Sequence, residues 1–290
     1  MALESTEPSE PNESNESNES TDPTEPSDPI KTTQQRTDNP LLQTDGLVKR
    51  FGQFTATDRV DLTIERGEFR SVIGPNGAGK TTLFNLITGA LPVTEGAIYF
   101  DGADITTLSP SARVRRGIGR SFQISNVFGG LTVRENVRLA IQSVARDEYT
   151  AVESLFKPTD RYDELNDRTE AILDRIGLAH VAAEQANALA YGDKRRLEIG
   201  VVLATDPELV LFDEPTAGMS VEETRETIDL LEAVLVDQTL LLIEHDIELV
   251  MELSDRITVL NGGQILAEGT PEEIAANQDV QNAYLGGMTE

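Results

Sequence analysis

Two short segments of the chain carry the residue types that phosphate chemistry requires. The first runs from Gly74 to Thr82, reads Gly-Pro-Asn-Gly-Ala-Gly-Lys-Thr-Thr and fits the pattern G-x-x-x-x-G-K-[ST]. Its glycines let backbone N–H groups turn toward a phosphate chain, and a helix after the loop points its positive end the same way. Lys80 is expected to reach the β- and γ-phosphates of a nucleotide, and the Thr81 hydroxyl to ligate Mg²⁺. The predicted phosphate-binding residues are Gly74, Pro75, Asn76, Gly77, Ala78, Gly79, Lys80, Thr81 and Thr82.

The second segment is an apolar run that ends in two carboxylates. Leu209–Phe212 reads Leu-Val-Leu-Phe and is followed by Asp213 and Glu214. A carboxylate at the end of such a strand holds Mg²⁺ directly or through water, and a neighbouring acid is placed to polarise an attacking water. Two acids after a buried strand are costly unless a cation lies nearby. We predict that Asp213 is a metal ligand and that Glu214 is the catalytic base.

Strands and helices are expected to alternate around these segments. Glu68–Gly74 reads as a strand that enters the glycine-rich loop, and Lys80–Leu91 reads as the helix that leaves it. Glu208–Asp213 and Thr239–Glu244 are short continuous apolar runs, typical of strands buried on both faces. Val221–Val236, between them, has helical spacing. The alternation predicts an α/β fold with a largely parallel, wound sheet.

Two further regions complete this outline. Residues 130–188 are charged and helix-like, which predicts an inserted helical subdomain. His245 follows the predicted strand Thr239–Glu244 and so lies at its carboxyl end, where wound sheets bind their ligands.

The composition excludes several classes of protein. Among 290 residues there are 24 Lys+Arg and 51 Asp+Glu, a net charge of −27, and no Cys. Without Cys there is no disulfide framework and no thiolate site, and no apolar stretch approaches the roughly 20 residues of a bilayer span. The N-terminal residues lack the features of a secretory signal, so we expect a cytoplasmic protein. The negative charge argues against nucleic acid as a partner.

Because the chain has only five Lys and its acidity extends along its length, we also expect adaptation to molar salt, which screens self-repulsion.

Residues 1–44 differ in composition from the rest of the chain. Six of the 13 Pro lie there, and Asn-Glu-Ser occurs three times between Asn12 and Ser20. So few apolar residues cannot offset the entropy of ordering, which predicts a disordered acidic tail and a folded domain over 45–290. In a cytoplasmic chain we interpret the three sequons as low-complexity sequence rather than as glycosylation sites.

With these motifs in place, the chain from Leu47 onward resembles the ATP-binding subunits of ABC transporters. Further elements of that family occur in the family's order. Phe51 matches the aromatic residue that stacks on adenine, and Gln123 matches the glutamine that senses Mg²⁺ and the membrane partner. Leu189–Asp193 stands where the family has Leu-Ser-Gly-Gly-Gln, and Ala217–Ser220 matches the loop through which two subunits communicate. His245 matches the histidine that contacts the γ-phosphate. The resemblance implies a P-loop NTPase fold with a RecA-like core, antiparallel β structure and an inserted α-helical subdomain.

One element departs from the family pattern. The family's serine, which bonds the γ-phosphate, is Ala190 here, its first glycine is Tyr191, and its final glutamine is Asp193. Gly192 and a helix after it remain, so Tyr191, Gly192 and Asp193 are still expected to face a nucleotide through backbone N–H groups. Loss of the hydroxyl costs about 1–2 kcal/mol. We therefore predict slow hydrolysis rather than none.

The resemblance extends to one group within the family. Gly117–Asn136, Arg195–Ile199, Gly269–Ile274 and Ala283–Gly286 look like branched-chain amino-acid importers, although urea importers and lipopolysaccharide exporters share much of this sequence. The implied mechanism is a head-to-tail dimer that sandwiches two Mg-ATP. In it, one chain supplies Lys80, Thr81, Asp213, Glu214 and His245, and the other supplies Gly192.

The implied partners are transmembrane permease subunits, a second ATP-binding subunit of the same or a related chain, and, indirectly, a solute-binding protein. The chain would then be peripheral on the inner face of the membrane. Two alternatives stay open, a soluble ABC ATPase without a membrane partner and a regulatory nucleotide binder that does not hydrolyse. The basic cluster of Arg113, Arg115, Arg116 and Arg120 is interpreted either as a contact to the membrane subunit or lipid, or as a solvated, internally paired face.

Overall fold

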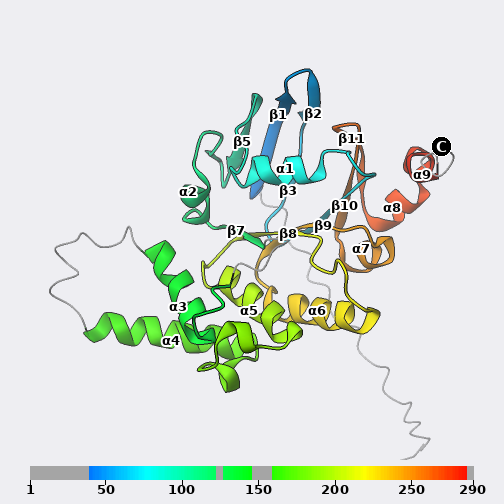
Figure 1. Ribbon diagram of the computed structural model, residues 1–290. Helices are drawn as coiled ribbons and strands as arrows, with labels where there is room; N and C mark the ends of the chain where they lie inside the picture. Colours follow the sequence, from blue (N-terminus) through cyan, green and yellow to red (C-terminus); the bar gives the residue numbers. More distant parts are fainter. Residues whose placement is uncertain (1–38, 122–126, 146–158, 286–290) are drawn as a thin grey trace, which may run out of the picture. The chain divides into compact units, whose positions relative to one another are not determined.

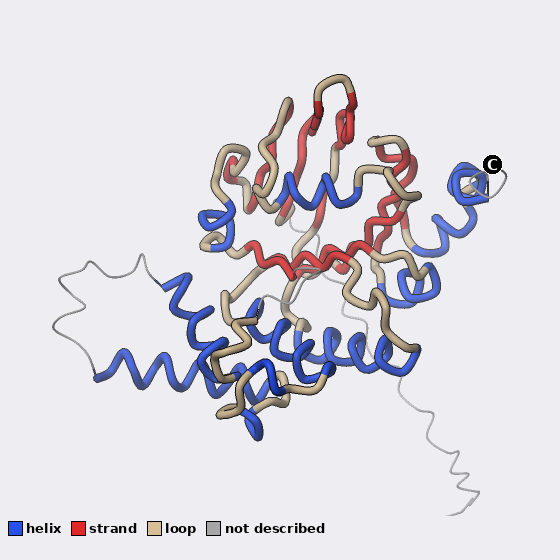
Figure 2. The backbone as a smooth tube through the Cα atoms, viewed as in Figure 1, coloured by secondary structure: helices blue, strands red, loops and turns tan. Residues whose placement is uncertain are grey.

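The computed structural model describes residues 39–121, 127–145 and 159–285. Its strands form two sheets, shown in Figures 1 and 2. The five-stranded antiparallel sheet has the order β2-β1-β5-β6, with β3 paired to β1. Its strands are β1 (Leu42–Phe51), β2 (Phe54–Val60), β3 (Thr63–Ile64), β5 (Glu95–Phe100) and β6 (Ala103–Asp104).

The six-stranded sheet carries the predicted chemistry. Its order is β11-β10-β4-β9-β8-β7, and all neighbours are parallel except β10 and β11. This arrangement confirms the predicted P-loop NTPase class with added antiparallel structure. The strands are β4 (Phe69–Ile73), β7 (Ile118–Ser121), β8 (Leu209–Asp213), β9 (Thr239–Ile243), β10 (Arg256–Asn261) and β11 (Gln264–Gly269).

Helices cover both faces of this sheet because its central strands are apolar on both sides. Leu209 and Leu211 of β8 pack in one cluster with α1, whereas Val210 and Phe212 pack in another with α5 and α6. Side chains alternate between faces along a strand, so α1 and the α5–α6 pair lie on opposite faces (Figure 1). The helices are α1 (Lys80–Ile87), α2 (Pro110–Val114), α3 (Val133–Val144), α4 (Thr159–Arg175), α5 (Tyr191–Leu203), α6 (Val221–Val234), α7 (Ile247–Leu253), α8 (Pro271–Ala276) and α9 (Gln278–Leu285).

The segment predicted to be a helical subdomain, residues 130–188, holds helices where it is described. It contains α3, α4 and two short 3-10 helices at Ala179–Val181 and Ala186–Ala188. α3 begins at a capping box in which Thr132 and Glu135 bond each other's backbone N–H groups. α3 and α4 pack against each other and against α5.

Two predicted boundaries differ from the structure. β1 begins at Leu42, so the folded domain starts before residue 45, and Leu41 and Leu42 are buried. Leu42 is paired with Phe100 of β5, a contact that the sequence pattern does not reveal. The first helix ends at Ile87 rather than at Leu91, because Gly89 adopts a left-handed backbone (φ 76°) just after the cap residue Thr88.

Within the described ranges, none of the helices combines the length and apolarity that a bilayer crossing requires.

Candidate functional site

The glycine-rich loop connects β4, in the middle of the parallel sheet, to α1. β4 lies between β10 and β9, so the loop leaves from the centre of the sheet's carboxyl edge. Gly79 is the cap residue of α1 with φ 103°, and a Cβ there would lie 2.5 Å from the carbonyl oxygen of Ala56 in β2. Because no side chain fits at this position, glycine is required here and allows the loop to lie close to β2. The start of α1 thereby directs its N–H groups at the space over the loop.

Lys80 extends back along this loop instead of into solvent. Its Nζ donates to the carbonyl oxygens of Gly74 (2.6 Å) and Pro75 (3.2 Å), and the residue is buried. Burial lowers the pKa of the Lys80 ammonium, while the nearby carboxylates of Glu214 and Asp213 act in the opposite direction. An ammonium group beside the loop and two carboxylates is placed to meet the phosphates of a nucleotide. Thr81, in the first turn of α1, is exposed and Thr82 is half-buried.

Asp213 ends β8 and has one carboxylate oxygen with an ion partner and one without. Its Oδ2 lies 3.4 Å from Nη2 of Arg120, and its buried Oδ1 has no hydrogen-bond partner. The residue is 5% exposed, and burial raises the pKa of its carboxyl group, opposed by Arg120. A buried acceptor without a partner is unfavourable unless a cation or a donor completes it.

Glu214 and His245 meet at the carboxyl ends of β8 and β9. Nε2 of His245 lies 2.7 Å from Oε1 of Glu214. Glu214 has a left-handed backbone (φ 51°), and its N–H donates to the carbonyl oxygen of Ile243 in β9. The turn after β8 therefore directs the Glu214 side chain toward the loop that follows β9. Both side chains are partly exposed, at 23% for Glu214 and 48% for His245, so water reaches them.

These residues fit a magnesium ion that arrives with a nucleotide. The Asp213 Oδ1 atom and the exposed Thr81 hydroxyl are the hard oxygen donors that Mg²⁺ prefers. In the described residues no group of three His, Cys, Asp or Glu side chains is able to hold a metal. A cation here would thus complete its shell with phosphate oxygens and water, as is usual for Mg²⁺ at nucleotide sites.

Two exposed aromatic rings lie at the tip of the β1–β2 hairpin. Phe51 is 47% exposed and is paired across the hairpin with Phe54, which is 62% exposed. Lys49 Nζ lies 5.1 Å from the centre of the Phe51 ring, a distance suited to a cation–π contact. An exposed ring with a cation near it suits the predicted contact of Phe51 with adenine. The second ring, Phe54, was not predicted.

Tyr191, Gly192 and Asp193 form the first turn of α5, on the other face of the sheet from α1. The cap residue Ala190 makes no side-chain capping bond, and Tyr191 is 57% exposed. Tyr191 and Gly192 border a small hollow of about 30 Å³ beside Met219 and the start of α6. One chain therefore does not bring these residues together with its own phosphate loop.

α5 does contact the loop that carries Glu214. Arg195 Nη2 donates to the carbonyl oxygen of Pro215 at 2.7 Å, and Arg195 Nη1 pairs with Glu198 at 2.7 Å. This contact was not predicted, because nothing in the sequence pattern relates Arg195 to Pro215.

The four arginines of the predicted basic cluster do not form a single surface patch. Arg113 is 1% exposed and donates at 2.6–3.2 Å to the carbonyl oxygens of Leu86, Ile87, Thr106 and Leu108. It completes the carbonyl groups at the end of α1, a structural role. Arg115 and Arg116 are exposed.

Arg120, the fourth member of that cluster, belongs to the site instead. Besides Asp213 it contacts Asn85 (2.6 Å) and Thr88 (3.3 Å) of the α1 segment. Nothing in the sequence pattern identifies this role, because the contact with Asp213 depends on β7 lying beside β8. Gln123, predicted to bind Mg²⁺ and nucleotide, lies outside the described residues.

Comparison with protein families gives two matches. The model described as "ABC transporter" matches residues 57–217, which contain the phosphate loop, Asp213 and Glu214. The model described as "Branched-chain amino acid ATP-binding cassette transporter" matches residues 264–288, from β11 through α9.

Individual proteins and structures are similar over nearly their whole length. The high-affinity branched-chain amino acid transport ATP-binding protein LivG of Salmonella typhimurium is 44% identical over 253 residues, which cover 85% of this chain and 98% of LivG. The ADP conformation of an ATP-binding cassette of an ABC transporter has a TM-score of 0.73 and 33% identity, over 86% of this chain and 100% of that one. A dimeric post-hydrolysis cassette bound to ADP and Pi has a TM-score of 0.64 and 26% identity, over 79% of this chain and 98% of that one.

Proposed function

The chain belongs to the ATP-binding proteins of the ABC transporter family, and we propose that it hydrolyses Mg-ATP to power an importer of branched-chain amino acids. The observation that carries the hydrolytic part is the 2.7 Å contact between Glu214 and His245, next to the unpartnered Oδ1 of Asp213. The substrate class rests on the 44% identity to LivG and on the family match at residues 264–288.

The residues of this chain divide the work of hydrolysis among them. Lys80 exchanges its bonds to the loop carbonyls for bonds to the β- and γ-phosphates, and Thr81 and Asp213 hold Mg²⁺. The ion, when bound, neutralises charge on the phosphates. Glu214 accepts a proton from water at a carboxylate oxygen as the water oxygen bonds to the γ-phosphorus and the bond to the β-phosphate oxygen breaks. His245 orients Glu214 and contacts the transferred phosphoryl group, and Phe51 stacks on the adenine.

A second copy, or a related chain, is needed to complete the site. Tyr191, Gly192 and Asp193 lie across the sheet from their own phosphate loop, and a similar cassette is described as dimeric. We place two chains head to tail, so that the first turn of α5 in one faces the nucleotide of the other. The dipole and backbone N–H groups of α5 remain available there, although Ala190 offers no hydroxyl.

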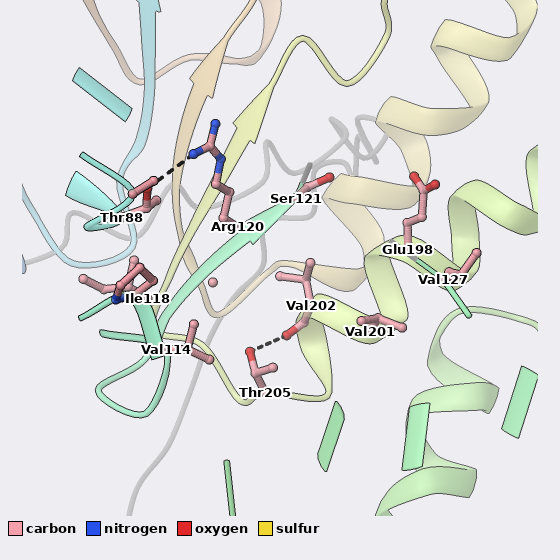
Figure 3. Close-up of a pocket in the computed structure, with 13 residues that line it drawn as sticks. Thr88, Val114, Ile118, Arg120, Ser121, Val127, Glu198, Val201, Val202 and Thr205 are labelled. Carbon is pink, nitrogen blue, oxygen red and sulfur yellow. Dashed lines mark hydrogen bonds between the residues drawn. The ribbon is translucent and has the colours of Figure 1, made fainter. Parts of the chain in front are cut away.

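The permease is proposed to dock in an apolar pocket of about 380 Å³ between the sheet edge and α5 (Figure 3). Figure 3 shows valine and isoleucine side chains around it, with Arg120 on its sheet side. Its walls include Ser121 and Val127, the described residues on either side of the segment that holds Gln123. An apolar segment of a membrane subunit fits this lining. Arg120 lines the pocket and also contacts Asp213, so it connects the pocket to the predicted metal ligand. The chain would then lie peripherally on the inner face of the membrane.

The composition supports a further part of the proposal, adaptation to molar salt. The net charge of −27 and the five Lys would keep such a chain hydrated while salt screens its self-repulsion. Unfolding curves recorded from low to molar KCl test this, since stability should rise steeply with salt.

The proposal is tested by uptake of labelled leucine in high salt, in cells whose chromosomal copy carries Glu214→Gln. Leucine uptake should collapse while urea uptake is unchanged. Unchanged leucine uptake would remove the branched-chain assignment, and loss of urea uptake would indicate a urea importer. Purified chain provides the second arm, because Glu214→Gln should bind ATP and turn it over at least about 100-fold more slowly. A wild-type rate in this variant would show that Glu214 is not the base.

A further inference from the structure

One buried carboxylate beside the site has no role in the chemistry described above. Glu244 directly follows β9, precedes His245 and is 4% exposed. Its Oε1 accepts from both the backbone N–H (3.1 Å) and the hydroxyl (2.6 Å) of Thr216. Its Oε2 accepts from the backbone N–H of His245 at 3.0 Å. Glu244 therefore bonds two loops at once, one after β8 and one after β9.

The environment of Glu244 is unusual for a carboxylate in a protein interior. Burial of a charge costs several kcal/mol unless hydrogen bonds or an opposite charge compensate it. In the part of the chain that the structure describes, the ion pairs formed by Lys and Arg do not include Glu244. Instead, the buried carboxylate accepts three hydrogen bonds from two loops, which offset the cost of its burial. These bonds form together only while the two loops keep this arrangement.

The two loops carry the two groups that meet at 2.7 Å. Thr216 lies two residues after Glu214, and His245 is the residue after Glu244. Glu214 adopts φ 51°, a left-handed conformation that costs a non-glycine residue about 1–2 kcal/mol. Such a conformation persists only where surrounding bonds enforce it. The Glu244 bonds to Thr216 fix the loop immediately after this strained residue.

We propose that Glu244 is a positioning residue for ATP hydrolysis, which holds Glu214 and His245 in contact by bonding the loops that carry them. The proposal rests on the proposed function insofar as Glu214 is the base. Glu244 itself touches neither the water nor the nucleotide. Its removal should therefore lower turnover without weakening ATP binding.

The test compares two isosteric changes of buried carboxylates in the same sheet region. Glu244→Gln keeps the size of the side chain but replaces one accepting oxygen with an NH₂ group, which then faces a backbone N–H donor. Glu68→Gln is the matched control, because Glu68 is also buried (7% exposed) but bonds Arg70 and Glu65 at the opposite end of β4 from the loop. In Glu244→Gln, kcat should fall about 10- to 100-fold while KM for ATP stays within about twofold. In Glu68→Gln, kcat per folded molecule should not change.

A second readout needs no nucleotide. Amide hydrogen exchange at Thr216 and His245 should be at least about tenfold faster in Glu244→Gln than in wild type and unchanged in Glu68→Gln. This arm reports on the loops even if purified chain does not hydrolyse ATP, so it separates failure of this proposal from failure of the proposed function. Exchange at these amides that is unchanged in Glu244→Gln would overturn the proposal.

Two further variants keep the idea falsifiable. In a Glu214→Gln background, Glu244→Gln should cause no further loss of turnover, because positioning acts through Glu214. A full additional loss would show that Glu244 acts independently and overturn the proposal. If Glu244→Gln does not fold, Thr216→Val removes only the 2.6 Å hydroxyl bond and should lower kcat about 3- to 10-fold. A Thr216→Val variant with the wild-type kcat would contradict the proposal.

Discussion

Removal of the charge on Asp213 should stabilise the nucleotide-free protein. Asp213 is 5% exposed and its Oδ1 has no hydrogen-bond partner, which costs about 1–3 kcal/mol. Against this, its Oδ2 lies 3.4 Å from Nη2 of Arg120, but the pKa of the Asp213 carboxyl group is still raised, so the cost of burying the charge exceeds this attraction. Asp213→Asn removes the buried charge and keeps the shape, but its neutral amide still lacks a partner, so only part of this cost is relieved. The net gain is about 1 kcal/mol, which corresponds to a rise in Tm of about 2–4 °C for a domain of this size.

The assay is thermal unfolding followed by circular dichroism in EDTA, without nucleotide. Glu214→Gln is the matched control, since it removes one carboxylate at the neighbouring position but one that is solvated and bonded to His245. This control should not raise Tm. With excess Mg-ATP the order should reverse, because only the wild type gains the stabilisation that comes from binding the ligand through Asp213. An Asp213→Asn protein that melts at or below the wild-type temperature in EDTA would refute the reasoning.

Three further outcomes are expected. Ala190→Ser should raise Tm by supplying the missing cap of α5, worth about 1 kcal/mol, and should also raise ATP turnover; no rise in turnover would contradict the account of slow hydrolysis. Glu135→Gln should destabilise the chain near neutral pH but not in acid: the bonds to Thr132 lower the pKa of Glu135, so its stabilisation is present above 4.5 and is lost as the pH falls through the lowered pKa, which urea titrations at several pH values will show. Gly79→Ala should cost several kcal/mol more than Gly77→Ala in the same titrations, because both have positive φ but only a Cβ at Gly79 meets a backbone oxygen, at 2.5 Å; equal costs would show that the loop moves aside.

The central strands could be predicted from the sequence because burial on both faces leaves an unmistakable pattern. β8 and β9 are continuous apolar runs, and β4 enters a loop whose glycine spacing has one chemical explanation. Residue type and spacing alone therefore locate Lys80 and Asp213 at the carboxyl edge of the sheet. The antiparallel sheet was expected only through family resemblance, since β1 mixes buried and exposed residues without clean alternation.

The contacts that hold the site could not be predicted, because they depend on how distant segments align. Arg120 reaches Asp213 only because β7 lies beside β8 with Ser121 opposite Phe212. Glu244 reads from sequence as the end of an apolar strand, and its bonds to Thr216 exist because β9 and β8 are parallel neighbours in that register. Residue types indicate what a site binds, whereas strand order determines which residues hold it in place.

The position of β4 between β9 and β10 has a consequence for how the protein is made. On the ribosome, the first sheet can form early, since all its strands are complete by Asp104. β4, the strand that enters the phosphate loop, cannot pair so early, because the first of its two neighbours to be synthesised, β9, begins only at Thr239. During most of synthesis β4 is therefore unpaired, and long-range parallel pairing of this kind folds slowly and leaves strand edges exposed. A nascent chain released before β9 therefore carries the entire glycine-rich sequence yet lacks the strand that holds it, and such fragments should bind no nucleotide and depend on chaperones to stay in solution.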